Sequence, residues 1–549
     1  MNSDNGWVKG DWGQPGHLQT PSNVTRIARA IKDQDNDHHQ QIVYYQAGIG
    51  TGIGLYNQIA GGGTGMGLGE NVREAYVFLA SNYAEHDLGI DPDSIFLLGF
   101  SRGAYTARSL GGLIGALGLL RKSAMPHFCE LFNDWEMAGD PKHTPQFWDS
   151  YFKHHTDVSR PPGLDRLAIM AKDKDQRDAY IELFKRHLVD LHLTQIVRIN
   201  CIGVWDTVGS LGIPVNPFLQ RVFPWAPAYI RSYKWFDTRL SSAVTHAFHA
   251  LALDERRSPF SPAIWERDPG STTTLKQVWF PGAHSNVGGS YDDEGTANIT
   301  LAWMMDQLAG HTTEHPDGKR EVDWIAFDEE YIDLWYGCAA SWHVKHLQTA
   351  YRGWAKGRIY DSSSFPQSLL GNTTRSPGRY HGTFYETGKT DTTRYLHDTN
   401  EYVHSCVRAR IDLAGRGIEP DWAETFPKGL NIRPLLAYWW RKLRGERSLY
   451  QPQKKGGPLH EWRLKDGHTT HRVPNEDIAM ESEGLDMVKW VYTGKEALEN
   501  KEMPEDRLGR YERLLLQKDP EVARKMEFTN DGWRWLEQPR MPVRSAKTF

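Results

Sequence analysis

Residues 95–108 read Ile-Phe-Leu-Leu-Gly-Phe-Ser-Arg-Gly-Ala-Tyr-Thr-Ala-Arg, and the predicted fold is built outward from this stretch. The apolar run at 95–98 predicts a buried strand, and the residues after the second glycine have the apolar spacing of a helix. Between them lies Gly99-Phe-Ser-Arg-Gly103, and a Gly-x-Ser-x-Gly sequence that joins a strand to a helix is typical of a nucleophile elbow. Ser101 is therefore the candidate nucleophile, and the backbone N–H of Arg102 is the candidate donor to an oxyanion. The alternative interpretation is an ordinary strand–helix turn flanked by glycines.

The composition is that of a globular protein and excludes several functional classes. Of the 549 residues, 39% are hydrophobic and 24% are charged, so the chain can form a large core and more than one domain. The net charge of -5 gives no support to nucleic-acid binding. Four widely separated cysteines predict neither a disulfide framework nor a zinc site. No apolar run reaches the length of a membrane span and the polar N-terminus is no signal peptide, so we expect a cytoplasmic protein.

Hydrophobic periodicity predicts strands that alternate with helices. Besides the strand at 95–98, strands are expected over residues 41–46, 195–207 and 275–280. Helices are expected over residues 20–31, 70–85, 178–188, 244–257, 299–308 and 496–517. This alternation predicts an α/β fold with a mostly parallel sheet flanked by helices.

The regular alternation ends near residue 310, which suggests a division of the chain. Residues 1–310 are predicted to form the catalytic core, with insertions at about 121–193 and 213–243 that resemble cap segments. The second insertion is crowded with aromatic residues, which suits a lid over an acyl chain and equally suits a buried loop. Residues 311–549 are expected to form a helical, loop-rich extension of mixed structure that acts as a lid or contacts a membrane or partner. Its apolar and then basic stretch 435–444 fits a membrane-surface helix or an ordinary packed helix.

Two further candidates follow predicted strands. Asp206 comes directly after the strand that ends in Trp205, and His284 lies on a glycine-rich segment after the strand 275–280. In an open α/β sheet, functional groups gather at the ends of such strands. The chain order Ser101, Asp206, His284 is that of α/β-hydrolases, in which the histidine takes the serine proton and the aspartate orients the histidine. Taken singly, a turn aspartate and a structural loop histidine remain the alternatives.

Rival sites receive less support from the sequence. The predicted helix 244–257 carries four rival residues, His246, His249, Asp254 and Glu255. Their helical spacing favours packing and ion pairs with Arg256 and Arg257. The run Asp292-Asp-Glu294 could bind a metal together with His284, but no second histidine stands at ligand spacing. The glycine-rich stretch 48–69 lacks the Gly-Lys-Ser/Thr ending of a phosphate-binding loop. We therefore expect no metal and no cofactor.

Six segments, in order, resemble a little-characterised α/β-hydrolase family that includes the first class of type VI secretion lipase effectors, which are phospholipases. The segments are Thr20-Pro-Ser-Asn-Val, Tyr44-Tyr-Gln-Ala-Gly-Ile-Gly-Thr-Gly52, Gly99-Phe-Ser-Arg-Gly-Ala-Tyr-Thr-Ala-Arg108, Val204-Trp-Asp-Thr-Val-Gly209, Ala250-Leu-Ala-Leu-Asp-Glu-Arg-Arg257 and Trp279-Phe-Pro-Gly-Ala-His-Ser-Asn-Val-Gly-Gly289. The resemblance covers residues 20–310. It implies Ser101 as nucleophile, Asp206 as acid and His284 as base, and a C-terminal portion that serves membrane attachment in the secreted relatives.

The N-terminus departs from that family. Its members usually begin with an apolar strand leading into Asp-Gly-Thr-Trp, whereas this chain offers only Asn5-Gly-Trp7. Either the chain as given starts after that first strand, or this form lacks it. The strand is expected to be central and to carry the second oxyanion donor on its loop.

These observations predict a serine hydrolase that cleaves ester bonds, with (phospho)lipids as the expected substrates, through an acyl-enzyme intermediate. Peripheral membrane contact is expected, and the sequence predicts no oligomeric state. One alternative is a small-ester or thioester hydrolase. The other is a non-catalytic α/β binding module that lacks the first strand.

Overall fold

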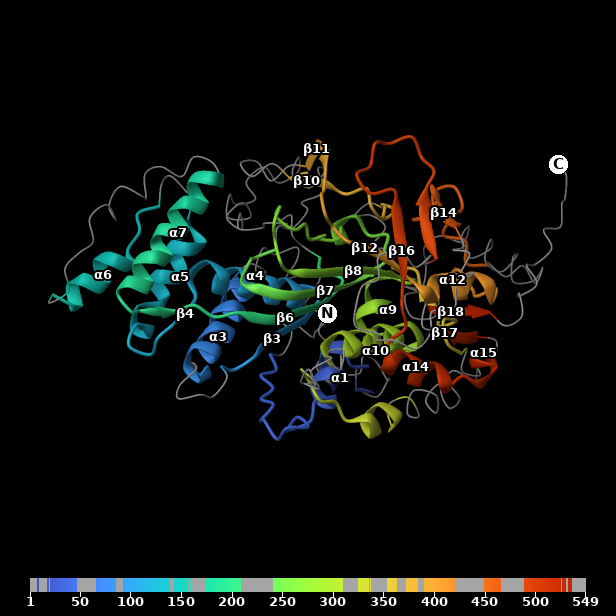
Figure 1. The fold of residues 1–549 in the computed structure, drawn as a ribbon, viewed down its shortest axis with the longest axis horizontal. Helices are drawn as coiled ribbons and strands as arrows, with labels where there is room; N and C mark the ends of the chain where they lie inside the picture. The colour runs from blue at the N-terminus through green and yellow to red at the C-terminus, as the bar shows by residue number, and fades with distance from the viewer. Residues whose placement is uncertain are drawn as a thin grey trace, which may run out of the picture.

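A computed structural model of the chain (Figure 1) shows how these segments are arranged. It describes residues 7–8, 17–18, 20–46, 66–84, 92–138, 143–156, 158, 174–208, 240–309, 324–334, 336, 353–362, 372–383, 390–419, 449–465, 488–524, 526–529 and 532–535. Most of the glycine-rich stretch, most of the aromatic insertion 213–243 and the stretch 435–444 lie outside these residues. The expectations for them therefore stay predictions.

One eight-stranded sheet organises the described part of the chain. Its order is β14-β15-β16-β12-β8-β7-β6-β3. The six strands from β16 to β3 are parallel, and β15 and β14 add an antiparallel edge. The predicted mostly parallel sheet flanked by helices is confirmed. The bounds are β3 Ile95–Phe100, β6 Ile199–Trp205, β7 Val244–Ala252, β8 Thr274–Phe280, β12 Glu401–His404, β14 Trp462–Lys465, β15 Lys489–Tyr492 and β16 Glu502–Asp506.

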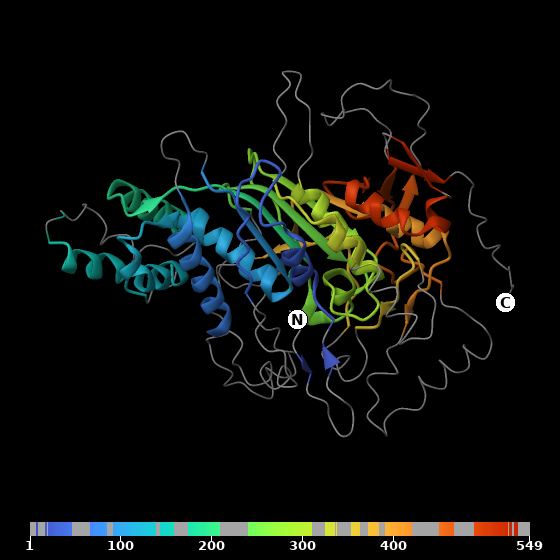
Figure 2. The same ribbon diagram turned by 90° about the horizontal axis from the view of Figure 1, so that it is seen from below.

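Helices cover both faces of the sheet. On one face α1, α10 and α14 share a core with alternate residues of the central strands, and Figure 1 shows the three helices close together. On the other face α3, α4 and the helices of the 121–193 segment form a second core. Figures 1 and 2 both show α5, α6 and α7 at the end of the molecule opposite the C-terminal strands. The bounds are α1 Asn23–Ala30, α3 Met66–Asn82, α4 Arg102–Leu117, α5 Phe128–Glu136, α6 Phe147–His154, α7 Lys174–Asp190, α10 Gly295–Ala309 and α14 Arg510–Gln517.

Smaller elements complete the fold. Three short helices are α9 His284–Gly288, α12 Ser405–Asp412 and α15 Pro520–Ala523, and two 3-10 turns are η1 Met125–His127 and η4 Ser258–Phe260. The two-stranded pairs are β1 (Trp7–Val8) with β2 (His17–Leu18), β4 (Leu119–Leu120) with β5 (Thr194–Gln195), β9 (Ile359–Tyr360) with β13 (Ile418–Glu419), β10 (His381–Thr383) with β11 (Thr390–Tyr395), and β17 (Met526–Thr529) with β18 (Gly532–Trp535). In the described ranges, no helix combines the length and apolar character needed to cross a bilayer.

The segment predicted as a helix over 244–257 is a strand, so that prediction was wrong. Its first nine residues form β7, which pairs with β6 between Val244 and Ala250 and with β8 between His246 and Ala252. A parallel strand covered on both faces reads as a nearly continuous run of small and apolar residues, as Val244 to Ala252 does. Pairing with a strand on each side overrides the high helix propensity of the alanines, because tertiary context outweighs intrinsic propensity.

The C-terminal half of the chain continues the sheet. Residues Glu401 to Val403 in β12 pair with β8, and β16 pairs with β12. The indole N–H of Trp279 in β8 donates to the Glu401 carboxylate at 2.7 Å. The boundary near residue 310 stays a prediction, but the sheet runs across it. The predicted helix 496–517 was wrong in its first half, because 502–506 form β16 and only 510–517 are helical.

The predicted strand over residues 41–46 does not form. These residues have no regular secondary structure, and the Ile42 side chain is 77% exposed. Apolar and aromatic residues favour a strand only where a neighbouring strand can pair with them. Among the described residues, β3 is the last strand on its side of the sheet and pairs only with β6, so residues 41–46 do not extend the sheet at that edge.

Candidate active site

Ser101 lies in a strained turn between β3 and α4. Its backbone angles are φ 58° and ψ −120°, a conformation that side-chain-bearing residues rarely adopt. The turn brings Gly99 against the following helix, where a Cβ at that position would lie 2.3 Å from the Gly103 carbonyl oxygen. Arg102 is the first residue of α4, and the first N–H groups of a helix have no acceptor within it. The turn therefore has the form expected of a nucleophile elbow, while the roles of Ser101 and Arg102 stay predictions.

Asp206 and His284 lie at the same edge of the sheet as Ser101. The strands β3, β6, β7 and β8 are parallel neighbours, so their carboxyl ends lie together. Asp206 directly follows β6, with a positive φ of 41°, and its backbone N–H donates to Ala250 at 2.7 Å. His284 follows β8 as the first residue of α9 rather than lying in an irregular loop, and it is 2% exposed.

A short hydrogen bond joins the two side chains. His284 Nδ1 lies 2.6 Å from Asp206 Oδ2. The His284 ring packs against Phe100, the residue before Ser101, with ring centroids 4.6 Å apart, and against Phe260 at 5.0 Å. His284 Nε2 is buried and has no hydrogen-bond partner among the described residues. The ring is thus held by its Nδ1 bond and by two aromatic rings, while Nε2 makes no hydrogen bond to the described residues.

Burial and the nearby Arg375 cation determine the protonation states of Asp206 and His284. Burial lowers the pKa of His284 to about 4, although the Asp206 carboxylate opposes this shift. Burial alone would raise the pKa of Asp206, but the Arg375 guanidinium and the hydrogen bond from His284 outweigh it and hold that pKa well below its usual range. At pH 7 the pair therefore consists of a neutral imidazole and a carboxylate, the protonation states that a general base and its orienting acid require.

Arg375 is a site residue that the sequence did not reveal. It lies in a stretch that reads only as a Ser/Pro/Gly-rich loop, and 169 positions separate it from Asp206. Its Nη1 donates to Asp206 Oδ1, and its Nη2 donates to Oδ2 at 3.0 Å. No periodicity or motif in the sequence marks this residue, so only the folded chain identifies it.

Glu255 supports the start of α9. Its Oε2 accepts the backbone N–H of His284 at 3.1 Å, and its other oxygen accepts the Ser362 hydroxyl at 2.7 Å. The Arg257 guanidinium pairs with the same carboxylate, with Nε 2.9 Å from Oε1. The expected ion pair between Glu255 and an arginine that follows it is therefore present, formed by Arg257. The same carboxylate also holds the backbone of His284.

The two rival histidines lie within β7 and have other contacts. His249 Nε2 accepts the Thr207 N–H at 3.1 Å, and Nδ1 lies 3.2 Å from Gln277 Oε1. Burial lowers the pKa of His249 to about 3, so the ring is neutral. The His246 ring lies 4.3 Å from Trp324, measured between ring centroids. Both histidines thus have the contacts of packed structural residues. His249 also accepts the backbone N–H of Thr207, the residue after Asp206.

The acidic run after α9 is engaged in structural hydrogen bonds. Asp292 accepts the Thr20 hydroxyl at 2.7 Å, and Asp293 accepts the backbone N–H groups of Gly295 and Arg358 at 3.0 and 2.9 Å. His284, the proposed fourth member, is bonded to Asp206 instead. Among the residues that the structure describes, no group of three histidine, cysteine or acidic side chains could hold a metal ion.

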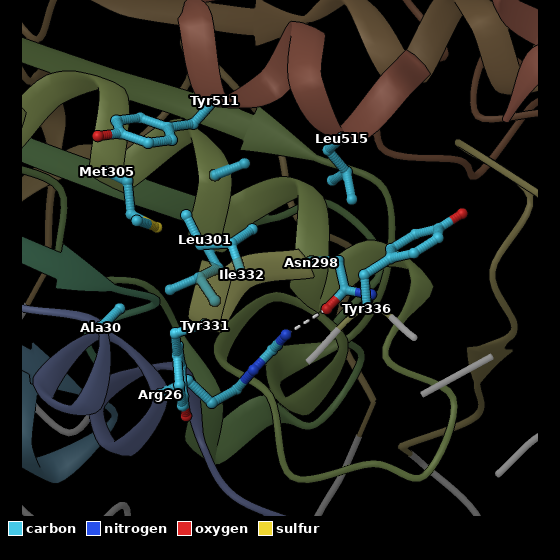
Figure 3. Close-up of a pocket in the computed structure, with 11 residues that line it drawn as sticks. Arg26, Ala30, Asn298, Leu301, Met305, Tyr331, Ile332, Tyr336, Tyr511 and Leu515 are labelled. Atoms are coloured by element: carbon cyan, nitrogen blue, oxygen red, sulfur yellow. Dashed lines mark hydrogen bonds between the residues drawn. The ribbon is translucent and has the colours of Figure 1, made fainter. Parts of the chain in front are cut away.

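A hollow lies apart from these residues, between α1, α10, α14 and residues 331–336. Figure 3 shows its lining, in which Arg26 points toward Asn298 and donates a hydrogen bond to its side-chain oxygen. The other walls are mostly apolar or aromatic, and none of the three predicted catalytic residues lines the hollow. The candidate site is therefore defined by the strand ends and not by this hollow.

Comparison with known proteins identifies the family. Residues 6–307 match the family model described as "T6SS, Phospholipase effector Tle1-like, catalytic domain". The uncharacterized protein YEL023C of Saccharomyces cerevisiae is 27% identical over 252 residues, which are 44% of this chain and only 29% of the yeast protein. The solved structure of the Tle1 effector bound to the VgrG spike from the Type 6 secretion system is 20% identical, over 50% of this chain and 41% of the effector. Its TM-score is 0.23, too low a similarity to support any argument about this chain. Because the family model spans more than half of the sequence, the chain belongs to the Tle1-like phospholipase effector family of the type VI secretion system.

Proposed function

We propose that the chain is a serine hydrolase of the α/β-hydrolase type that cleaves ester bonds of phospholipids. The observation that carries this proposal is the 2.6 Å bond between Asp206 and His284, with Nε2 of that histidine unpartnered among the described residues. The strained turn of Ser101 ends the strand next to the one that Asp206 follows. A hydroxyl is a poor nucleophile until a neighbouring base takes its proton, and this arrangement supplies such a base.

The first half of the reaction forms an acyl-enzyme. Ser101 Oγ attacks the ester carbonyl carbon while its proton passes to His284 Nε2, and Asp206 stabilises the imidazolium that results. The carbonyl oxygen becomes an oxyanion, which the backbone N–H of Arg102 and the positive end of α4 stabilise. As the tetrahedral intermediate collapses, the ester C–O bond breaks. His284 then returns the proton to the leaving alcohol.

The second half releases the acid. A water molecule attacks the acyl carbon and gives one proton to His284 Nε2. Collapse of the second tetrahedral intermediate breaks the bond to Ser101 Oγ, and the same proton returns to that oxygen. The products are a fatty acid and a free enzyme in its starting protonation state. This chemistry uses no group from outside the chain except water.

Membership of a phospholipase family supports a lipid substrate. A phospholipid lies in a membrane or micelle, so the chain would work at that surface through peripheral contact. We expect turnover of phosphatidylcholine and phosphatidylglycerol vesicles well above that of soluble short-chain nitrophenyl esters at equal ester concentration. Released fatty acid and nitrophenol are the two readouts. Turnover of the soluble esters alone would favour the small-ester or thioester alternative.

A serine-directed fluorophosphonate probe tests the enzyme class. We expect one labelled site in the full chain, and no label in Ser101→Ala, because only an activated hydroxyl reacts at a useful rate. Ser109→Ala, in the helix α4 that follows Ser101, is the matched control and should label like the wild type. Folded wild-type protein that takes no label would instead indicate a non-catalytic binding module.

Gly288→Ala tests the packing around the base. A Cβ at position 288 would lie 2.0 Å from a ring carbon of Phe100, the ring that packs on His284. Displacement of that ring is expected to lower the probe labelling rate by about 10- to 100-fold, since small shifts in a site are costly. The control is Gly112→Ala in α4, where a Cβ meets nothing within 4 Å. It should label normally, and normal labelling of both variants would contradict the packing argument.

A further inference from the structure

We propose that Arg375 is a positioning residue of this site, which fixes the ionised Asp206 carboxylate and so sets the orientation and charge state of His284. The inference rests on the proposed function and adds to it a residue outside the matched catalytic region, which ends at 307. The proposed site would thus consist of the three predicted catalytic residues and Arg375, which lies in the C-terminal half of the chain.

The guanidinium is held in place independently of the carboxylate. Both side chains are buried, with 1% exposure for Arg375 and 0% for Asp206. Besides its two bonds to Asp206, Arg375 donates to the carbonyl oxygen of Ala252 at 3.0 Å and to that of Phe260 at 2.7 Å. These carbonyl groups lie on β7 and on η4, which are parts of the site's framework. Arg375 is therefore a rigid fork aimed at the carboxylate, a geometry that a flexible lysine would not reproduce in full.

With this fork in place, the Asp206 carboxylate has little freedom to rotate. Oδ1 accepts from Arg375 and from the Ala252 N–H at 3.0 Å, and Oδ2 accepts from Arg375 and from His284. Each oxygen thus has two donors, close to the number that a carboxylate oxygen can accept. A carboxylate held this way keeps Nδ1 of His284 protonated and leaves the lone pair of Nε2 for the serine proton.

The positive charge has a second effect on the base. A cation beside Asp206 cancels part of the negative charge that would otherwise favour the imidazolium form of His284. Removal of the cation should therefore raise the pKa of His284, and the base would be lost to protonation at a higher pH. Among the described residues, the other titratable and charged side chains near the pair are Glu255, Arg257, Arg108, Tyr380 and the neutral His249. They are the same in every Arg375 variant, so they do not alter the sign of this effect.

A purely structural role would be to anchor the segment that follows residue 372. Arg379 provides a matched control for that role, because it lies four residues further along the same segment. Its guanidinium pairs with Glu461 and Glu496 and makes no bond to Asp206. Loss of Arg379 should loosen the segment without changing the charge at the catalytic pair.

The experiment measures the second-order rate constant of fluorophosphonate labelling between pH 3 and 9, in the full chain. Folding of each variant is checked by circular dichroism. In Arg375→Met we expect the midpoint of the acidic limb to move up by about one pH unit or more, the usual effect of a charge this close. Labelling at pH 4.5, relative to its value at pH 9, should then be about threefold lower in this variant than in the wild type, because the pKa of the wild-type base is about 4. Arg375→Lys should recover most of this shift, and Arg379→Met should keep the wild-type profile.

An Arg375→Met profile with the wild-type midpoint would overturn the proposal, and so would an equal shift in Arg379→Met. Arg375→Gln keeps amide donors without the charge and replaces the methionine variant if that one does not fold. If neither neutral variant folds, Arg375 is a structural residue and the proposal is wrong. A wild-type chain that takes no label refutes the proposed function instead, so the two failures are distinguishable.

Discussion

Replacing His284 with alanine is expected to lower the rate of ester hydrolysis by about 10⁴- to 10⁶-fold, as loss of the base does in other serine hydrolases. The expected size follows from the geometry, because His284 is the only imidazole bonded to Asp206 among the described residues. Without it, none of the other described side chains is expected to take the proton of Ser101. Initial rates on phospholipid vesicles and the labelling rate constant should fall together.

The rival histidines of β7 are the controls. His246→Ala should hydrolyse lipid at a near wild-type rate. His249→Ala removes the acceptor of the Thr207 N–H and the partner of Gln277, so it should lower the free energy of unfolding by about 1–3 kcal/mol. Its rate constant, measured on folded protein, should nevertheless remain within about tenfold of the wild type. An equal loss in either control would reassign the base.

Asp206→Ala is expected to damage both catalysis and stability. Loss of the orienting carboxylate should lower the rate by about 10⁴-fold, because the imidazole is then free to adopt the wrong tautomer. The same change leaves the buried Arg375 cation without its counter-charge. Breaking a buried ion pair on one side typically costs about 3–5 kcal/mol of folding free energy. Urea unfolding and vesicle hydrolysis measure the two losses separately.

The variant Glu505→Ala distinguishes the loss of catalysis from the loss of stability. Glu505 forms a comparable buried pair with Arg408, with Nε 2.8 Å from Oε1 and Nη2 2.9 Å from Oε2, in the C-terminal part of the sheet. Its removal should cost a similar amount of stability, while the folded fraction keeps its rate of labelling. If Asp206→Ala were as active as Glu505→Ala, Asp206 would have no catalytic role.

The parts of the fold that could be predicted from sequence depend on local signals. The run at 95–98 and the glycines at 99 and 103 demand a strand, a tight turn and a helix whatever surrounds them, and β3 and α4 form as expected. The strand after residue 274 is equally local in origin. The six-motif resemblance to a phospholipase effector family is confirmed by the match over residues 6–307.

The errors arose where neighbouring strands decide the structure. Residues 244–252 have small and apolar side chains that suit either a helix or a strand, and only the pairing with β6 and β8 selects the strand. Residues 41–46 have strong strand propensity but no described partner strand. Arg375 shows which kind of site residue could not be predicted from the sequence. A buried cation contributed by an irregular segment has no periodic pattern, so sequence reasoning could name the three predicted catalytic residues but not this fourth.

The continuation of one sheet across the middle of the chain bears on how the protein is made. During synthesis, β8 is made before β12, whose Glu401 pairs with Gln277. Likewise, Asp206 is made before Arg375, its partner in the ion pair. Pairings between segments so far apart form slowly, because a long loop must close first. The ribosome thus adds Ser101, Asp206 and His284 well before it adds β12, which pairs with β8, and Arg375, which neutralises the buried charge of Asp206. We therefore expect the proposed site to stay incomplete during translation at least until residues 375 and 401–403 have been added.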